Sequence, residues 1–308
     1  MSPSSSSSDR PGSAPGGGSS ARARLAAERL QKEQRRRRLL LVVVPVAVVL
    51  VAVVALVAVR LTGIGRSPAP VAAAAPDDAV VSAVTSVPKS VLDQIGAGSV
   101  TALPKAITAP ALTAGGKPRV LYVGAEYCPY CAAERWAMVV ALSRFGTFTA
   151  LGQTASAADD VYPSTPTLSF HGSSFTGQQV AFTGVETEGN TKVSGGYAPL
   201  DNLSTADQQV FSTYDAAPYV DSSGAGSIPF VDIGGRYLIS GASYNPQLLA
   251  GKTHQQVASA LAQPSSPIAQ AVDGTANVIT AAICATTKNA PSSVCSSAGV
   301  VAAAKRLS

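Results

Sequence analysis

Two cysteines three positions apart carry the clearest chemical signal in this 308-residue chain. Cys128 and Cys131 enclose a Pro-Tyr dipeptide. They follow an apolar run at 119–124 that favours a β-strand, and they precede a segment dense in helix formers at 132–145. A Cys-x-x-Cys pair between a strand and a helix is typical of thiol–disulfide redox chemistry. The spacing therefore predicts a redox-active cysteine pair.

The position of the pair at the start of a helix predicts a role for each thiol. Pro129 suits the first turn of a helix, where its missing N–H is not needed. Cys128 then lies at the helix N-terminus, where unpaired N–H groups and the helix dipole favour a thiolate over a thiol. Because a thiolate is the form that attacks a disulfide, we predict that Cys128 is the nucleophile and Cys131 the resolving thiol.

Two other interpretations of the pair stay open at this point. A static disulfide would use the same spacing, and a zinc site would use the two thiols as half of its ligands. Zinc requires four ligands, and outside this pair the chain offers only His171, His254 and the cysteines Cys284 and Cys295. We expect neither a metal nor a cofactor.

A second element lies further along the chain. Pro229 begins a predicted strand that leads through a Gly-Gly turn into a second strand ending at Ile239. With the upstream motif, this hairpin resembles the thioredoxin superfamily, in which a cis-proline opens such a hairpin beside the Cys-x-x-Cys pair. The resemblance implies a cis bond before Pro229, and a substrate-binding set of Ile228, Pro229, Pro129 and Tyr130. An ordinary trans-proline at a strand edge is the alternative, because cis bonds are the minority.

The chain is also similar to a family of membrane-anchored thioredoxin-like proteins catalogued as domain of unknown function 929. The resembling stretches are residues 122–136, 143–146 and 162–167. The resemblance covers roughly residues 85–300. It implies an α/β fold outside the membrane, with a thioredoxin-like central sheet flanked by helices, and it implies no established substrate.

The segment between the Cys-x-x-Cys helix and the proline strand, residues 146–225, is longer than a minimal thioredoxin domain uses. We predict that it holds the next core strand and an insertion near the rim of the site. Strands are expected at 167–170 and 179–182, and a helix at 203–214 capped by Ser204. Later helices are expected at 253–261 and 268–284.

The second cysteine pair flanks a ten-residue loop with turn-forming Asn-Ala-Pro. We expect Cys284 and Cys295 to form a structural disulfide, since sequence proximity favours that pairing and an oxidising outer compartment preserves it. A relay, in which this pair exchanges electrons with the first pair, is the alternative.

A long apolar run near the N-terminus predicts a membrane anchor. Leu39 to Val59 is twenty-one residues without a charged side chain, which as a helix spans roughly 30 Å of hydrocarbon. Four arginines, Arg35–Arg38, precede it, and the positive-inside rule places that side in the cytoplasm. A cleaved signal peptide or a buried core helix would be the alternatives, but the first needs a small-residue cleavage site and the second a shorter run.

The distribution of charge and composition divides the rest of the chain. Residues 1–62 hold ten Lys or Arg against three Asp or Glu, whereas residues 63–308 hold thirteen against fifteen. The basic charge therefore belongs to the leader, and we expect no nucleic-acid binding. The predicted regions are a disordered basic cytoplasmic tail (1–38), a transmembrane helix (39–60), an Ala/Pro-rich linker (61–87), an extracytoplasmic thioredoxin-like domain (88–300) and a C-terminal tail (301–308).

These observations favour a single-pass, membrane-anchored thiol–disulfide oxidoreductase that acts outside the cell membrane. Its expected partners are thiols and disulfides of secreted or membrane proteins, an unidentified redox partner, and the membrane itself through residues 39–59. The alternative is a non-catalytic thioredoxin-like binding module with a static Cys128–Cys131 disulfide.

Overall fold

The computed structural model describes residues 78–307. The predicted cytoplasmic tail and the predicted transmembrane helix at 39–60 lie outside the described residues, as does most of the predicted linker.

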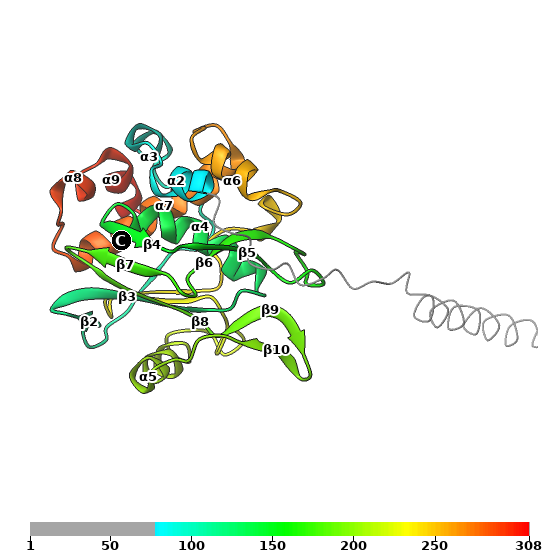
Figure 1. The fold of residues 1–308 in the computed structure, drawn as a ribbon. Helices are drawn as coiled ribbons and strands as arrows, with labels where there is room; N and C mark the ends of the chain where they lie inside the picture. The colour runs from blue at the N-terminus through cyan, green and yellow to red at the C-terminus, as the bar shows by residue number, and fades with distance from the viewer. Residues whose placement is uncertain (1–77, 308) are drawn as a thin grey trace, which may run out of the picture. The chain divides into compact units, whose positions relative to one another are not determined.

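A mixed β-sheet forms the centre of the described fold (Figure 1). Among residues 78–307 it has six strands: five follow the order β1-β12-β11-β3-β2, and the sixth, β8, pairs with β3 in parallel. The neighbour β11 runs antiparallel to β3. The strands are β1 (Lys105–Ala106), β2 (Thr113–Ala114), β3 (Lys117–Gly124), β8 (Ala181–Glu186), β11 (Phe230–Ile233) and β12 (Tyr237–Ser240).

Strand β3 is the central strand because its side chains are apolar on both faces. Val120 and Tyr122 belong to the larger apolar cluster of the fold, whereas Leu121 and Val123 belong to a second cluster on the opposite face. Alternating side chains of a strand point to opposite faces of a sheet, so a continuous apolar run is buried from both sides.

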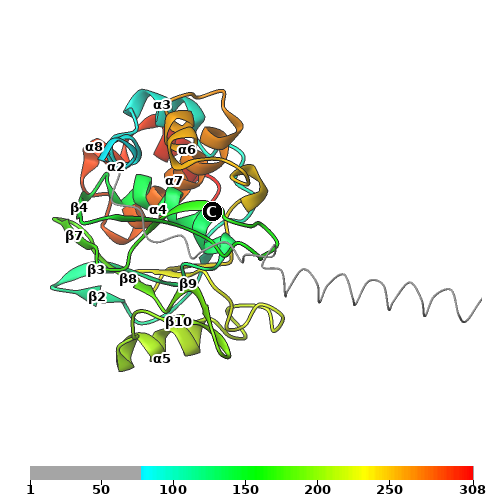
Figure 2. The same cartoon turned by 45° about the vertical axis from the view of Figure 1, so that its right-hand side comes forward.

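Helices cover the two faces unequally (Figures 1 and 2). One face carries most of the helices, with α4 and α7 packed against each other. The other face carries α5 and the hairpin β9–β10. The helices are α2 (Asp78–Thr85), α3 (Lys89–Ile95), α4 (Pro129–Leu142), α5 (Thr205–Tyr214), α6 (His254–Leu261), α7 (Pro267–Thr286), α8 (Ser292–Cys295) and α9 (Ala298–Ala304), with a 3₁₀ turn at Pro246–Leu248. The sequence prediction of an α/β fold with a central sheet flanked by helices is thus confirmed.

Helix α4 is the core helix of this arrangement. Every residue from Pro129 to Leu142 is buried except Tyr130, whose exposed fraction is 40%. A helix that is buried on all sides belongs to the interior of a fold. The indole Nε1 of Trp136, on this helix, donates a hydrogen bond to the Pro166 carbonyl oxygen at 2.9 Å, so this buried polar group has a partner.

The long segment between α4 and β11 contains the core strand β8 and three two-stranded antiparallel sheets. Before β8 come the pairs β4–β7 and β5–β6, and after it comes β9–β10. The predicted strand at 167–170 and the predicted helix capped by Ser204 are confirmed, but the strand expected at 179–182 lies instead at Ala181–Glu186. Its bounds follow from its parallel register with β3, which a local sequence pattern does not contain. The strands of these small sheets are β4 (Gly146–Thr149), β5 (Gly152–Ala155), β6 (Pro166–Ser169), β7 (Ser174–Gly177), β9 (Glu188–Val193) and β10 (Gly196–Pro199).

The fold extends beyond both predicted bounds of the domain, residues 88 and 300. The predicted linker at 61–87 includes helix α2, which packs against α4 and α6 through the buried side chains of Val80 and Val84. These two residues lie one helical turn apart and form one apolar face. The predicted tail at 301–308 likewise includes the end of α9, where Ala303 is fully buried.

Helix α7 is long and apolar enough to cross a membrane by length and composition, and it is the one such helix within residues 78–307. Most of its surface is buried within the fold, as is typical of the core helix of a soluble domain.

Two buried carboxylic acids lie on the helices of this core. Glu134 on α4 accepts hydrogen bonds from the backbone N–H and the hydroxyl of Ser243, at 2.8 and 3.0 Å, and burial raises its pKa to about 7. Asp273 on α7 has no hydrogen-bond partner within the described residues at either carboxylate oxygen, and burial raises its pKa to about 8. Both side chains are therefore largely protonated in mildly acidic solution.

We predict that Asp273 makes the stability of the fold depend on pH. In the unfolded chain an aspartate titrates near roughly pH 4, whereas in the fold its pKa is about 8. The protonated acid therefore makes its full contribution to the free energy of unfolding below about pH 4, and this contribution is lost as the pH rises towards 8. The free energy of unfolding of Asp273→Asn, measured by urea denaturation, should fall less over this range than that of the unmodified chain.

The Glu134→Gln variant is the matched control. It should flatten the pH dependence only up to about pH 7, because the pKa of Glu134 is lower. Identical pH profiles for Asp273→Asn and the unmodified chain would show that Asp273 is not protonated in the fold.

Candidate functional site

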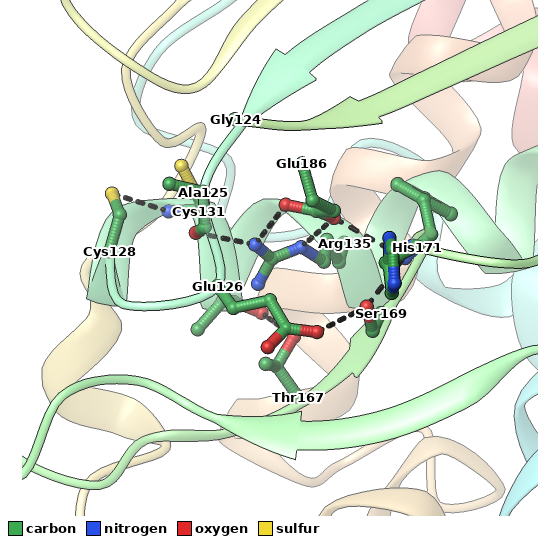
Figure 3. Close-up of polar contacts among 12 residues, drawn as sticks. Gly124, Ala125, Glu126, Cys128, Cys131, Arg135, Thr167, Ser169, His171 and Glu186 are labelled. Carbon is green, nitrogen blue, oxygen red and sulfur yellow. Dashed lines mark hydrogen bonds and ion pairs between the residues drawn. The ribbon is translucent and has the colours of Figure 1, made fainter. Parts of the chain in front are cut away.

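Cys128 occupies the position immediately before helix α4. It is the N-cap residue, and its Sγ accepts a hydrogen bond from the backbone N–H of Cys131 at 3.2 Å (Figure 3). Pro129 fills the first helical position, as predicted from its missing N–H. The unpaired donors at the start of the helix are thus directed at one sulfur atom.

The two thiols differ in acidity although both are free and buried. The pKa of Cys128 is lowered, first by its hydrogen bond with the Cys131 thiol and then, against the effect of burial, by the Cys131 backbone N–H and the positive charge of Arg135. The pKa of Cys131 is raised well above its usual range, mainly by complete burial and then by the neighbouring Cys128 sulfur. The site therefore holds one thiol that ionises readily and one that does not.

A fully buried ion pair lies behind the two sulfurs. Arg135 Nε and Nη2 donate hydrogen bonds to the two carboxylate oxygens of Glu186, at 2.7 and 2.6 Å, and neither side chain is exposed. Arg135 Nη2 also donates to the carbonyl oxygen of Ala125 at 2.6 Å. In Figure 3 the guanidinium lies between the Glu186 carboxylate and the backbone of Ala125. One side chain thus joins helix α4, strand β8 and the loop that leads to Cys128.

The charge of Arg135 is retained despite its burial. Desolvation is the largest single influence and lowers the pKa of the guanidinium, but Glu186, Tyr122 and Cys131 together outweigh it and raise the pKa well above its usual range. The guanidinium also lies 5.8 Å from the ring centroid of Tyr122. Little water screens a permanent positive charge in a dry environment, and this charge lowers the pKa of both Cys128 and Cys131.

The predicted proline loop lies on the other side of Cys128. The Ile228–Pro229 peptide bond is cis, as the sequence resemblance implied. The Cys128 thiol lies 3.7 Å from the carbonyl oxygen of Ile228 and donates a hydrogen bond to it. The Pro229 carbonyl accepts from the Gly241 N–H at 2.8 Å, which ties the loop to the end of β12. Residues one hundred positions apart therefore meet at one sulfur.

The loop before Cys128 is held by backbone bonds to the long segment between α4 and β11. The Glu126 N–H donates to the Glu188 carbonyl, and the Ala157 N–H donates to the Tyr127 carbonyl, both at 2.8 Å. The Glu126 carboxylate accepts a hydrogen bond from the Ser169 hydroxyl at 2.6 Å. The segment thus fixes the approach to the motif from two sides.

The other predicted site residues lie elsewhere. Cys284 and Cys295 are joined in a disulfide, which confirms the predicted pairing. His171 Nδ1 contacts the Asp201 carboxylate at 2.7 Å, and His254 Nε2 lies 2.8 Å from the Thr154 carbonyl oxygen. Within residues 78–307 no three His, Cys, Asp or Glu side chains are grouped so as to hold a metal ion.

Sequence reasoning did not identify Arg135 or Glu186 as site residues. Arg135 follows Cys131 by four positions, which places it one turn further on the same face of a helix, and this spacing is a usable signal. Glu186 reaches the site because it pairs with Gly124 in the parallel register of β8 with β3. No local pattern reveals that pairing.

We predict that the buried pair lowers the pKa of Cys128. Removing both charges with Arg135→Met and Glu186→Met keeps the apolar bulk, and it should move the pH dependence of Cys128 alkylation to higher pH. The single variant Arg135→Met leaves a buried carboxylate unpaired and should lower stability by about 3–5 kcal/mol. The alkylation of each cysteine can be followed by peptide mass spectrometry.

Arg144→Met is the matched control, because Arg144 is a partly buried arginine that bonds to Asn277 and Ser297 away from the cysteine pair. Its Cys128 should titrate as in the unmodified chain. An unchanged Cys128 titration in the double variant would exclude the electrostatic role of Arg135.

Comparison with known proteins gives a family but no characterised relative. No curated protein matches the chain, and no solved structure matches it. Residues 105–285 match one family, and this region extends from β1 to α7 and contains both Cys128 and Pro229. Since the match covers more than half of the sequence, the chain belongs to the family described as Domain of unknown function (DUF929).

Proposed function

We propose that this protein is a membrane-anchored thiol–disulfide oxidoreductase that exchanges disulfides with secreted or membrane proteins. The observation that carries the proposal is the contrast between the two thiols. Cys128 lies at the start of α4 with a lowered pKa, and Cys131 lies one turn further on with a raised pKa. Attack on a disulfide requires a thiolate, which the lowered pKa of Cys128 favours although the residue exposes only 5% of its surface. The resolving thiol needs only to reach the resulting bond.

The order of the central strands supports a thioredoxin-like fold. The Cys-x-x-Cys motif follows β3, the parallel neighbour β8 lies on one side, and the antiparallel pair β11–β12 lies on the other. A cis-proline precedes β11 beside Cys128, as the resemblance to that superfamily implies. In this proposal the backbone of Ile228 and Pro229 holds the substrate chain, with Pro129 and Tyr130 beside it.

The proposed exchange proceeds in two steps. The Cys128 thiolate attacks one sulfur of a substrate disulfide, which forms a mixed disulfide and releases the other substrate sulfur as a thiolate. Cys131 then loses its proton to that thiolate and attacks the Cys128 sulfur, which forms the Cys128–Cys131 disulfide and releases the second substrate sulfur as a thiolate. The substrate gains two electrons and one proton from the protein, its remaining thiolate takes a second proton from water, and the reverse sequence oxidises it. The two cysteines carry both electrons, so the exchange requires no cofactor.

Stabilisation of the Cys128 thiolate favours the reduced state of the protein. A dithiol that is stabilised in this way makes the corresponding disulfide a stronger oxidant. We therefore favour oxidation of substrate thiols, with a disulfide-bearing redox partner that reoxidises the Cys128–Cys131 pair.

The proposed location outside the membrane rests on two observations. The sequence from Leu39 to Val59 is long enough to span a bilayer, and Arg35–Arg38 precede it. The second observation is the disulfide between Cys284 and Cys295, because disulfides persist in oxidising compartments.

We predict that Cys128→Ser abolishes exchange and that Cys131→Ser stops it at the mixed disulfide. With the oxidised full chain and a reduced two-cysteine peptide, the unmodified chain should form the peptide disulfide, and Cys128→Ser should be slower by at least about 100-fold. Cys131→Ser lacks the resolving thiol, so after exposure to a disulfide peptide it should accumulate a mixed disulfide on Cys128. Mass spectrometry without reducing agent detects this species.

The double variant Cys284→Ser with Cys295→Ser is the control. It should retain exchange, because these cysteines form a separate disulfide. Loss of exchange in a folded double variant would favour the relay between the two pairs. Equal rates for the unmodified chain and Cys128→Ser would leave the non-catalytic binding module as the better explanation.

We also predict that the anchor holds the domain outside the membrane. The full chain should stay with membranes after an alkaline wash, and deletion of residues 39–59 should release it. After reduction with a phosphine that cannot cross membranes, a thiol reagent that cannot cross membranes should label Cys128 in intact cells. Labelling only after the cells are opened would place the domain on the cytoplasmic side instead.

A further inference from the structure

Two tyrosines of the motif each contact a tyrosine of the long segment between α4 and β11. Tyr127, just before Cys128, stacks on Tyr197 of β10 with ring centroids 4.1 Å apart. Tyr130, two residues after Cys128, meets Tyr162 edge to face at 5.9 Å. Tyr162 lies in the loop between β5 and β6. The two tyrosines that flank Cys128 in the sequence thus each form an aromatic pair with a different part of that segment.

These two parts are tied to one another as well as to the motif. The Asn190 side-chain amide of β9 donates to the Ala155 carbonyl of β5 at 2.9 Å. Lys192 of β9 forms an ion pair with Asp159 of the β5–β6 loop. Both parts also form backbone hydrogen bonds to the motif, one through Glu188 and the other through Ala157. We call these two parts together, residues 157–164 and 188–199, the tyrosine rim.

The tyrosine rim exposes apolar side chains. Among the residues that the structure describes, four large apolar side chains are strongly exposed, and three of them lie on the motif or the rim. These are Tyr130, Val161 and Val193, with exposed fractions of 40%, 65% and 49%. Aromatic and apolar side chains that stay exposed beside a reactive group favour contact with another chain.

The charge of the rim is negative. It carries Asp159, Asp160 and Glu188 against the single cation Lys192, which is already paired with Asp159. Neither Asp160 nor Glu188 forms an ion pair with another residue in 78–307. Two carboxylates thus accompany the four tyrosines.

We propose that the tyrosine rim is the docking surface for substrate, and that it selects extended protein segments with a basic residue beside the reacting cysteine. The inference rests on the proposed disulfide exchange and adds the class of substrate to it. Lys192 already lies over the Tyr197 ring, 5.9 Å from its centroid, so a substrate cation finds the exposed ring of Tyr130 instead. A lysine or arginine of the substrate contacts Asp160 or Glu188 and this ring, which attracts cations. Opposite charges also speed the encounter of two chains.

The test compares three probes with the full chain. Two are reduced two-cysteine peptides of equal length, one with lysines and one with glutamates beside the cysteines. The third is 2-hydroxyethyl disulfide, which is small and uncharged and does not reach across the rim. The unmodified chain should oxidise the lysine peptide about tenfold faster than the glutamate peptide at low salt, and added salt should reduce the difference.

The variants distinguish the effect of the tyrosine rings from the effect of the carboxylates. Tyr162→Ala with Tyr197→Ala should lower kcat/KM for the lysine peptide about tenfold while exchange with 2-hydroxyethyl disulfide changes less than about twofold. The isosteric pair Asp160→Asn and Glu188→Gln should remove the preference for lysine, and it serves as the test if ring removal unfolds the rim. Tyr237→Ala is the matched control, since this half-buried tyrosine begins β12 at the opposite end of the sheet.

The outcomes separate this inference from the function on which it rests. Exchange with all three probes, with no preference for lysine and no effect of the rim variants, would overturn the docking surface and leave the oxidoreductase intact. Absence of exchange with every probe would overturn both. A full chain that is dimeric in solution and becomes monomeric on loss of Tyr162 and Tyr197 would assign the rim to a second copy instead, and would also overturn the proposal.

Discussion

The buried ion pair between Arg135 and Glu186 is the interaction on which the arrangement of the site depends. It connects the core helix α4 to the end of strand β8, and its third hydrogen bond fixes the loop before Cys128. A charge in such a place is stable only with a good partner, since burial of an unpaired ion costs several kcal/mol. The pair therefore ties the position of the cysteine motif to the register of the sheet, and it brings a permanent positive charge close to the sulfurs.

Features encoded by neighbouring residues were predictable from the sequence. The strand before the motif, the helix beginning at Pro129, the cap at Ser204 and the disulfide between Cys284 and Cys295 all follow from short patterns, and the structure has them. The contact of Cys128 with Ile228 is different, because it joins residues one hundred positions apart, and it was anticipated only through resemblance to known folds. Glu186 was not anticipated at all, because its place depends on strand pairing rather than on its neighbours.

The boundary of the domain shows a similar limit. Residues 78–87 are rich in alanine and valine and follow a proline-rich stretch, so composition favoured a spacer. Val80 and Val84 nevertheless lie on one face of α2, and the fold supplies the surface that buries them. A short apolar helix gains most of its stability from such packing rather than from its own propensity. Composition therefore describes the segment correctly and still misses the helix.

The distribution of charge around the two cysteines argues for chemistry rather than for support alone. A static disulfide needs only two sulfurs at bonding distance and gains nothing from a difference in their acidity. A buried arginine–glutamate pair is weak evidence for stability, because apolar residues of similar volume often stabilise a core as well or better. Here the hydrogen bond with the Cys131 thiol, the helix N-terminus and the charge of Arg135 lower the pKa of Cys128, whereas complete burial raises the pKa of Cys131. The cis-proline loop extends the same asymmetry, since the Cys128 thiol donates a hydrogen bond to the Ile228 carbonyl oxygen and the tyrosines that flank Cys128 in the sequence form the two aromatic pairs.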